Sequence, residues 1–239
     1  MIMTTDFRVY LLIGLFIYIC ILMIFFNSVV TGKSKSKNVL LNQKIVKWRH
    51  LLRGQMLSSH NVKKHKRYLI KKLAHSKNLI FYAIALKHFK EVVNSSYNEY
   101  LTQNHSAFKK LSDIYLKKSE FEKACYLSFI SDFPEIIKYN PQLLHTLTFY
   151  LKDVNKKNNL LSMNALRMVS NCGNSKAFVN VLQIINDNDV FIHHHVLTTE
   201  LSNFNGDKKE LLTQLQKSNW SDKIENSIKI FNLYMQDGE

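Results

Sequence analysis

An apolar run near the N-terminus constrains this chain most, because it contains no charged residue from Val9 to Phe26. The run continues with weaker apolar character to Val30, so it reaches the roughly 20 residues that a helix needs to cross the hydrocarbon core of a bilayer. We therefore expect a transmembrane helix over residues 9–30, preceded by a short N-terminal tail over residues 1–8.

A cleaved signal peptide is the alternative explanation of this run. It would carry a basic region before a shorter apolar stretch and a small-residue cleavage site. Here Asp6 and Arg8 cancel one another, and the positive charge follows the run at Lys33, Lys35 and Lys37. Basic flanks of membrane helices remain in the cytoplasm. The sequence thus favours a retained, single-pass anchor in the inner membrane of a bacterial cell, with the C-terminal domain in the cytoplasm.

The net charge of +15 is concentrated directly behind the apolar run. Residues 31–100 hold sixteen Lys or Arg against two acids, whereas residues 101–239 hold sixteen against fifteen. A basic stretch next to a membrane helix is attracted to anionic lipid headgroups by about 1 kcal/mol per cation near the surface. The residues expected to make this contact are Lys33, Lys35, Lys37, Lys44, Lys47, Arg49, Arg53, Lys63, Lys64, Lys66 and Arg67.

Nucleic-acid binding is a competing explanation of the same charge. The cluster Lys63-Lys64-His65-Lys66-Arg67 has the electrostatics of a phosphate-binding surface. No recognised nucleic-acid-binding motif accompanies this cluster, and a tethered chain meets lipid first. A basic helical nucleic-acid-binding module tethered to the membrane is therefore the second alternative.

The soluble part contains few residues that break helices. Only six Gly and two Pro occur in the 239 residues, too few for the turns of sandwiches, barrels or doubly wound sheets. Helical periodicity is evident instead, since Ile45, Trp48 and Leu52 share one helix face. We expect an all-α protein, with a basic linker over residues 31–38 and basic juxtamembrane helices over residues 39–105.

Helix ends are marked by capping signals. Ser119-x-x-Glu122 and Asp207-x-x-Glu210 have the spacing of capping boxes. Asn140-Pro141 predicts a cap followed by proline at the first helical position, and Gly173 predicts a helix end. After the helix over residues 39–58, the expected helices lie over residues 63–75, 78–90, 106–117, 120–131, 141–152, 159–171, 175–186, 190–203, 208–217 and 222–235.

The C-terminal third shows internal repetition. A shift of about 32 residues superposes Ala165 on Leu197, Val169 on Leu201 and Cys172 on Phe204. Each unit then has a first helix, a turn rich in Asn, Gly and Asp, and a second helix. Helix pairs at a regular interval predict a solenoid.

The motif Ala165-Leu166-x-Met168-Val169, followed by Cys172-Gly173-Asn174 and Phe178-x-x-Val181-Leu182, resembles HEAT-type helical repeats. The Asp/Val/Arg signature that opens the second helix of many HEAT units is missing, which leaves the repeat subtype open. The resemblance implies an α-solenoid of HEAT-like helix pairs over residues 106–239.

A single N-terminal membrane helix followed by divergent HEAT-like repeats also resembles small bacterial proteins that accompany membrane-embedded family 2 glycosyltransferases. This resemblance implies a membrane protein partner, a polysaccharide-synthesising glycosyltransferase among the candidates. We therefore expect a scaffold or adaptor that binds its partner at the cytoplasmic membrane face.

Motifs for catalysis or metal binding are missing from the sequence. There is no nucleophile elbow, Gly-rich phosphate loop, HExxH or paired-carboxylate motif. The run His193-His194-His195 does not fit a metal site, because adjacent residues on a helix point about 100° apart. Cys20, Cys125 and Cys172 show neither disulfide nor ligand spacing. We expect no enzyme, cofactor or metal site.

Overall fold

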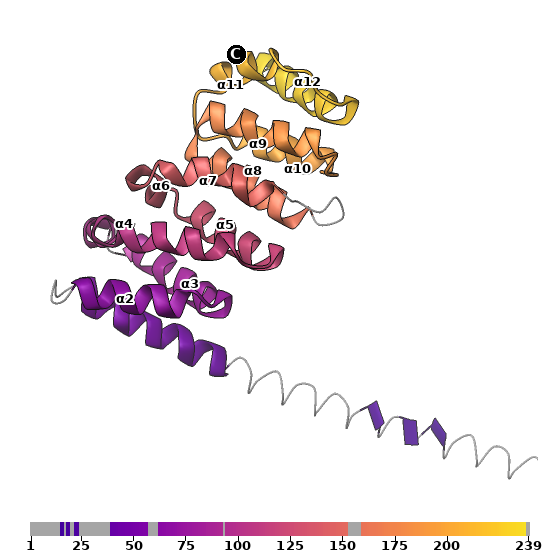
Figure 1. Cartoon of the computed structure of the whole chain (residues 1–239). Coiled ribbons are helices and arrows are strands. Elements are labelled where there is room, and N and C mark those ends of the chain that lie inside the picture. The colour runs from indigo at the N-terminus through magenta and orange to yellow at the C-terminus, as the bar shows by residue number, and fades with distance from the viewer. Residues whose placement is uncertain are drawn as a thin grey trace, which may run out of the picture. The chain divides into compact units, whose positions relative to one another are not determined.

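The computed structural model describes residues 39–56, 62–92, 94–152 and 159–237, together with Leu15, Phe16, Tyr18, Ile19, Leu22 and Met23. Every regular element among these residues is a helix, and the helices pack sequentially in pairs (Figure 1). The predicted all-α class is therefore confirmed. After the helix over residues 39–56 come α2 (Val62–Leu73), α3 (Ser76–Val92), α4 (Asn94–Leu116), α5 (Glu120–Asp132), α6 (Glu135–Tyr139), α7 (Gln142–Leu151), α8 (Leu160–Cys172), α9 (Ser175–Asp187), α10 (His194–Ser202), α11 (Lys208–Leu215) and α12 (Asp222–Asp237).

The chain divides into two compact units, Met1–Trp48 and Arg49–Glu239. In the first unit, the six described residues of the predicted membrane segment are helical and expose their apolar side chains. The rest of that segment and the predicted linker over residues 31–38 lie outside the described residues. Among the residues that the structure describes, no helix combines the length and the apolar character needed to cross a bilayer. The transmembrane helix therefore stays a prediction.

The helices of the second unit form two layers. Layer A contains α2, α4, α7, α9 and α11, and layer B contains α3, α5, α8, α10 and α12. Each helix packs against the next helix of its own layer, and successive helices such as α2 and α3 or α8 and α9 pack across the layers. The short α6 packs against α4 and α7. Figure 1 shows this order as a gradual change of colour from α2 to α12.

Hydrogen bonds between neighbouring helices of a layer repeat at a similar distance along the chain. In layer A, the hydroxyl of Tyr115 donates to Leu73 O at 2.7 Å, and that of Tyr150 donates to Ser112 O at 2.7 Å. These partners lie 42 and 38 residues apart. Each hydroxyl satisfies a carbonyl that is buried in the core. A repeating contact of this kind follows from helix pairs stacked at a regular interval.

Layer B has equivalent bonds made by side-chain amides. Asn164 donates to Ala124 O at 3.0 Å and Asn171 donates to Ser131 O at 2.9 Å, both over 40 residues. Because both ends of α8 are bonded at the same offset, α5 and α8 run parallel. The next step joins α8 to α10, where Ser170 Oγ donates to Glu200 O at 2.7 Å over 30 residues. This step agrees with the predicted shift of about 32 residues.

Two turns between consecutive helices approach one another closely. Gly173 ends α8 in the left-handed conformation with φ of 65°, as predicted. A Cβ atom on Gly173 would meet Asn205 O at 2.2 Å, and one on Gly206 would meet Gly173 O at 2.3 Å. The backbone of the second turn therefore rests directly on the first, which only glycine permits.

Most capping predictions are confirmed. Ser119 and Asp207 are N-caps that accept hydrogen bonds from backbone N–H groups of the next helix. The prediction for Asn140 is wrong, because its side chain donates to His105 O at 3.0 Å and α7 begins after Pro141. Three helix predictions also differ: α4 begins at Asn94 instead of residue 106, α10 begins at His194 instead of residue 190, and α6 was not expected.

Aromatic side chains form the centre of the core. Tyr126, Phe129 and Tyr150 are buried, and Tyr126 stacks on Tyr115 with ring centroids 4.9 Å apart. The phenol of Tyr126 donates to Phe108 O at 2.8 Å, so its polar end is satisfied. Not every aromatic residue of this region packs inward, however. Phe121 and Phe149 are exposed instead.

Candidate functional site

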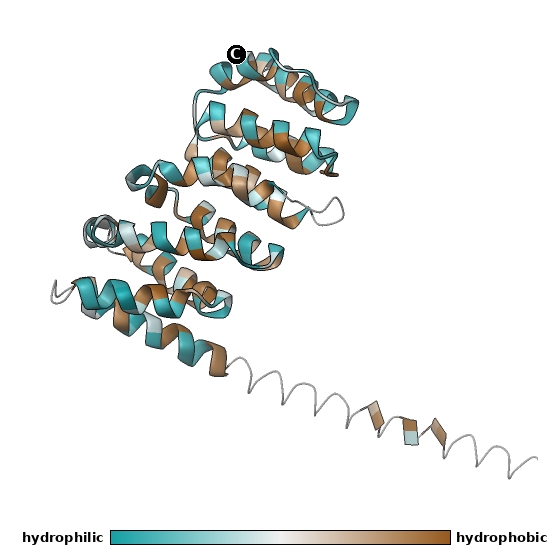
Figure 2. Ribbon diagram, in the orientation of Figure 1, coloured by the Kyte–Doolittle hydropathy of each residue, from teal (hydrophilic) through white to brown (hydrophobic). Residues whose placement is uncertain are grey.

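Helix α2 carries a dense set of cations. Its sequence, VKKHKRYLIKKL, contains six Lys or Arg and no acid, and Figure 2 shows it as largely hydrophilic. Lys63, Arg67 and Lys71 are exposed and lie one helical turn apart. They point away from the buried face that His65 and Leu69 form on the other side of the helix. We call Lys63, Arg67 and Lys71 the basic row.

Two buried contacts fix the rotation of α2 and therefore the direction of the basic row. His65 Nε2 is hydrogen-bonded to the hydroxyl of Tyr100 at 3.0 Å, which is bonded in turn to the hydroxyl of Tyr82 at 3.1 Å. Burial lowers the pKa of His65 to about 4, so its imidazole is neutral near pH 7. At the other end of the helix, Tyr115 donates to Leu73 O.

The remaining predicted headgroup contacts occupy several positions. Lys64 is exposed and Lys66 half-buried on the flanks of the same helix. Arg53 is exposed and Arg49 half-buried in the part of the helix over residues 39–56 that belongs to the second unit. In the first unit Lys44 and Lys47 are exposed, and the three lysines of the linker lie outside the described residues. Lys71 was not among the predicted contacts, although it continues the four-residue spacing of Lys63 and Arg67.

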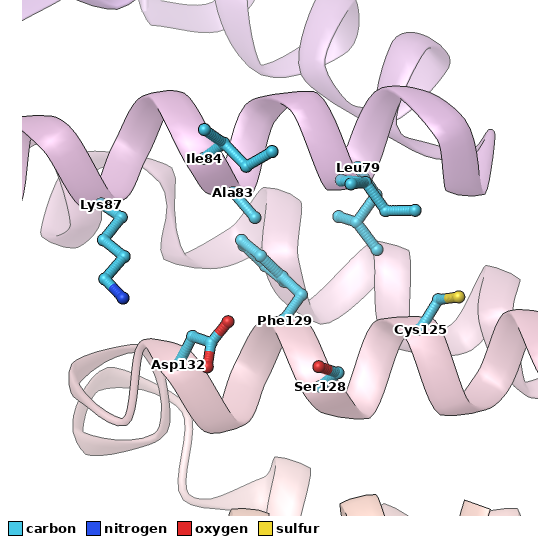
Figure 3. A pocket seen from close by; sticks show the side chains of 9 residues that line it. Leu79, Ala83, Ile84, Lys87, Cys125, Ser128, Phe129 and Asp132 are labelled. Atoms are coloured by element: carbon cyan, nitrogen blue, oxygen red, sulfur yellow. The ribbon is translucent and has the colours of Figure 1, made fainter. Parts of the chain in front are cut away.

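An open groove of about 280 Å³ lies between α3 and α5 of layer B (Figure 3). Because the two helices are neighbours only after folding, no local sequence motif indicates this groove. Leu79, Ala83 and Phe129 form its apolar floor, as the close view shows. The full lining is Leu79, Ile80, Ala83, Ile84 and Lys87 from α3, and Cys125, Ser128, Phe129 and Asp132 from α5.

Exposed apolar side chains line the groove and continue beyond its Leu79 end. Ile80 and Ile84 on α3, Phe121 on α5 and Leu160 on α8 are all exposed, Phe121 to 59%. Phe121 lies one turn before Cys125 on the groove-facing side of α5, and Leu160 is level with the start of α5 because of the 40-residue offset between the two helices. We call these four residues the apolar band.

Charged residues lie at the other end of the groove. Burial raises the pKa of Asp132, and the nearby cations Lys87, Arg167 and Lys90 oppose this shift. Lys90 Nζ is 2.8 Å from Glu135 Oε1, and Arg167 Nε is 3.3 Å from Glu200 Oε1. The groove thus has an apolar end and a charged end of balanced sign.

The groove offers binding chemistry more than catalytic chemistry. Burial raises the pKa of the Cys125 thiol, and the carboxylate of Glu122 raises it further. A thiol with a raised pKa is a weak nucleophile at neutral pH. Apolar walls with a few polar groups at one end are typical of a site that takes apolar side chains.

The three consecutive histidines have a structural position. His193 is the N-cap of α10, and its Nδ1 accepts a hydrogen bond from the N–H of His195 at 3.2 Å. Across the described ranges, with their gaps at 57–61, 93 and 153–158, no three His, Cys, Asp or Glu side chains are grouped to hold a metal ion.

The fold and the surfaces define an all-α protein with helices packed sequentially in pairs, a basic helix near one end and an apolar groove in one layer. No protein family, curated protein or solved structure matches the chain.

Proposed function

We propose that the chain is a membrane-anchored helical-repeat scaffold or adaptor that binds a protein partner at the cytoplasmic face of the bacterial inner membrane. The exposed groove and apolar band on layer B carry this proposal. Four exposed apolar side chains on three adjacent helices are unfavourable in water, and a partner that covers them removes this cost. Stacked helix pairs present such surfaces rigidly.

A HEAT-like α-solenoid is the repeat type we propose for the second unit. Three observations support it: the two layers, the bonds that recur every 30 to 42 residues, and the resemblance of the segment from Ala165 to Leu182 to HEAT units. The glycine contact between Gly173 and Gly206 gives consecutive units a fixed spacing.

Tethering is the proposed mechanism. An anchor over residues 9–30 confines the stack to the membrane plane, which raises its effective concentration towards a partner in the same membrane. By the resemblance of its architecture, we propose that this partner is a polysaccharide-synthesising glycosyltransferase and that the chain is its accessory protein. The groove between α3 and α5 would then take an apolar face of a partner helix.

The test uses the full chain, cross-linked in its own membranes and recovered in mild detergent. We expect a membrane glycosyltransferase to be captured, and the double variant Ile84→Glu/Phe121→Glu to lose it. Phe149→Glu is the matched control, because Phe149 is exposed to 60% but lies in layer A. Recovery of the chain as a freely soluble protein, or capture of no membrane protein at all, would overturn the proposal.

Nucleic-acid binding is the second candidate, favoured by the basic row. If it is the function, the full chain binds duplex or single-stranded DNA with a steep salt dependence, and reversing the charge of Lys63, Lys64, Lys66 and Arg67 abolishes that binding.

A further inference from the structure

Most charges of α2 do not stabilise the helix that carries them, although Lys71 and Lys72 in its last turn suit the helix dipole. Lys63 and Lys64 lie in its first turn, where the helix dipole favours anions instead. Lys63, Arg67 and Lys71 repeat at a spacing of four residues, at which like charges repel. In the part of the chain that the structure describes, no acidic side chain forms an ion pair with any of these cations.

Tertiary contacts hold α2 in place despite this repulsion. His65, Leu69 and Leu73 are buried, and the bonds to Tyr100 and Tyr115 fix both ends of the helix. The outward direction of the basic row is therefore set by packing. A row of cations with a fixed direction and no acidic partner among the described residues is suited to an anionic surface outside the protein.

We infer that the basic row, with Lys64 beside it, binds the phosphate groups of anionic lipid headgroups and so lays α2 along the membrane surface. This inference rests on the proposed membrane anchor, which would bring the row close to the bilayer. It makes the predicted headgroup contact specific, because it assigns the contact to one face of one helix and adds Lys71 to it.

Lipid fits the surroundings of the row better than nucleic acid does. A single-strand-binding surface adds exposed rings on which bases stack. The ring nearest in sequence, Tyr68, is half-buried, and Lys72 Nζ already lies 5.9 Å from its centroid. Residues 101–239 hold sixteen cations against fifteen acids, so the basic surface does not extend along the stack as a nucleic-acid track would.

The two surfaces of the second unit could then act at the same time. The basic row faces away from the side on which α2 packs against α3 and α4. The groove and the apolar band belong to layer B, between α3, α5 and α8. A headgroup contact through α2 therefore leaves the groove open for the partner.

The experiment measures lysine acylation in the full chain, reconstituted in phosphatidylcholine vesicles with or without phosphatidylglycerol. We expect Lys63, Lys64 and Lys71 to react at least threefold more slowly on the anionic vesicles, and 0.5 M salt to remove the difference. Lys176 and Lys217, exposed on α9 and just after α11, are internal controls whose rates should not change. Equal rates on both kinds of vesicle would overturn the inference.

Variants and competing ligands distinguish binding to lipid headgroups from binding to DNA or to free inorganic phosphate. The variant Lys63→Gln/Arg67→Gln/Lys71→Gln should abolish the protection of Lys64, and its circular dichroism should match that of the unchanged chain, because Gln is as good a helix former as Lys. Stronger protection by duplex DNA, or equal protection by free inorganic phosphate, would also overturn the inference. Flotation with neutral vesicles in 0.5 M salt tests the anchor separately. Under these conditions the basic row does not bind lipid, so only the proposed membrane helix would make the chain float with the vesicles.

Discussion

At the scale of single residues, a close contact between two backbone segments constrains how consecutive helix pairs pack. Gly173 and Gly206 lie 33 positions apart in sequence, yet their turns are in direct contact. Asn205 strengthens this contact, since its N–H donates to Ser170 O at 3.0 Å. The position of one helix pair on the next therefore depends on two residues that have no side chain.

Substitution of either glycine should destabilise the protein markedly. We expect Gly206→Ala to lower the free energy of unfolding by about 2–3 kcal/mol, because its Cβ would overlap Gly173 O. Gly173→Ala should cost more, since alanine is also strained at a φ of 65°. Chemical denaturation of the full chain, reconstituted in detergent, measures both values.

Gly54→Ala is the matched control. It lies inside the helix over residues 39–56, and its Cβ would meet no atom within 4 Å. Alanine should therefore stabilise that helix by up to about 1 kcal/mol. If Gly206→Ala were as harmless as Gly54→Ala, the close contact between the two turns would not exist in solution.

At the scale of helices, α2 shows how an unfavourable local sequence is held by tertiary contacts. Its cations oppose one another, while its buried face includes an imidazole that must stay neutral. The stability of its docking should therefore depend on pH through His65.

The lowered pKa of His65 predicts in which direction the stability of this packing changes with pH. Its pKa is 6.5 in the unfolded chain and about 4 in the folded one, so the unfolded state binds the proton first. Stability from this residue is complete above pH 6.5 and is lost as the pH falls towards 4, by about 3 kcal/mol. We expect His65→Gln to be less stable than the unchanged chain at pH 7, and this difference to shrink by pH 4.

Denaturation curves at pH 7 and pH 4.5 measure the effect. Asp132 and Glu200, whose pKa values are raised by burial, titrate alike in both proteins, so their contributions cancel in the comparison. A difference between the two proteins that stays constant over this range would show that His65 is not buried as a neutral group.

The helices also show what the sequence could and could not predict. Caps such as Ser119 and Asp207 were predictable because a local side chain satisfies the free N–H groups of its own helix. Asn140 looked the same locally, but its amide binds His105 O on another helix, and no local pattern carries that information. The groove between α3 and α5 was missed for the same reason, because its walls lie some 45 residues apart.

At the scale of the whole second unit, the stability of each helix should depend mainly on the helices next to it in the stack. Each helix contacts the next helix of its layer, several contact a helix of the other layer that is near in sequence, and no extensive contact joins helices far apart in the described part of the unit. In such a stack, a perturbation at one end weakens nearby helices and leaves distant ones intact. This property would allow the basic row of α2 to contact lipid while helices farther along the stack change conformation on binding a partner.

Leu211→Ala in α11 tests this independence. Leu211 is fully buried, so its truncation should cost about 2–4 kcal/mol. We expect hydrogen exchange to accelerate in α9 to α12 and to stay unchanged in α2 to α5. Leu127→Ala in α5 is the matched control, equally buried but central, and it should accelerate exchange on both sides. Uniform acceleration in both variants would mean that the helices unfold as one cooperative unit, and a stack with independent ends would have to be abandoned.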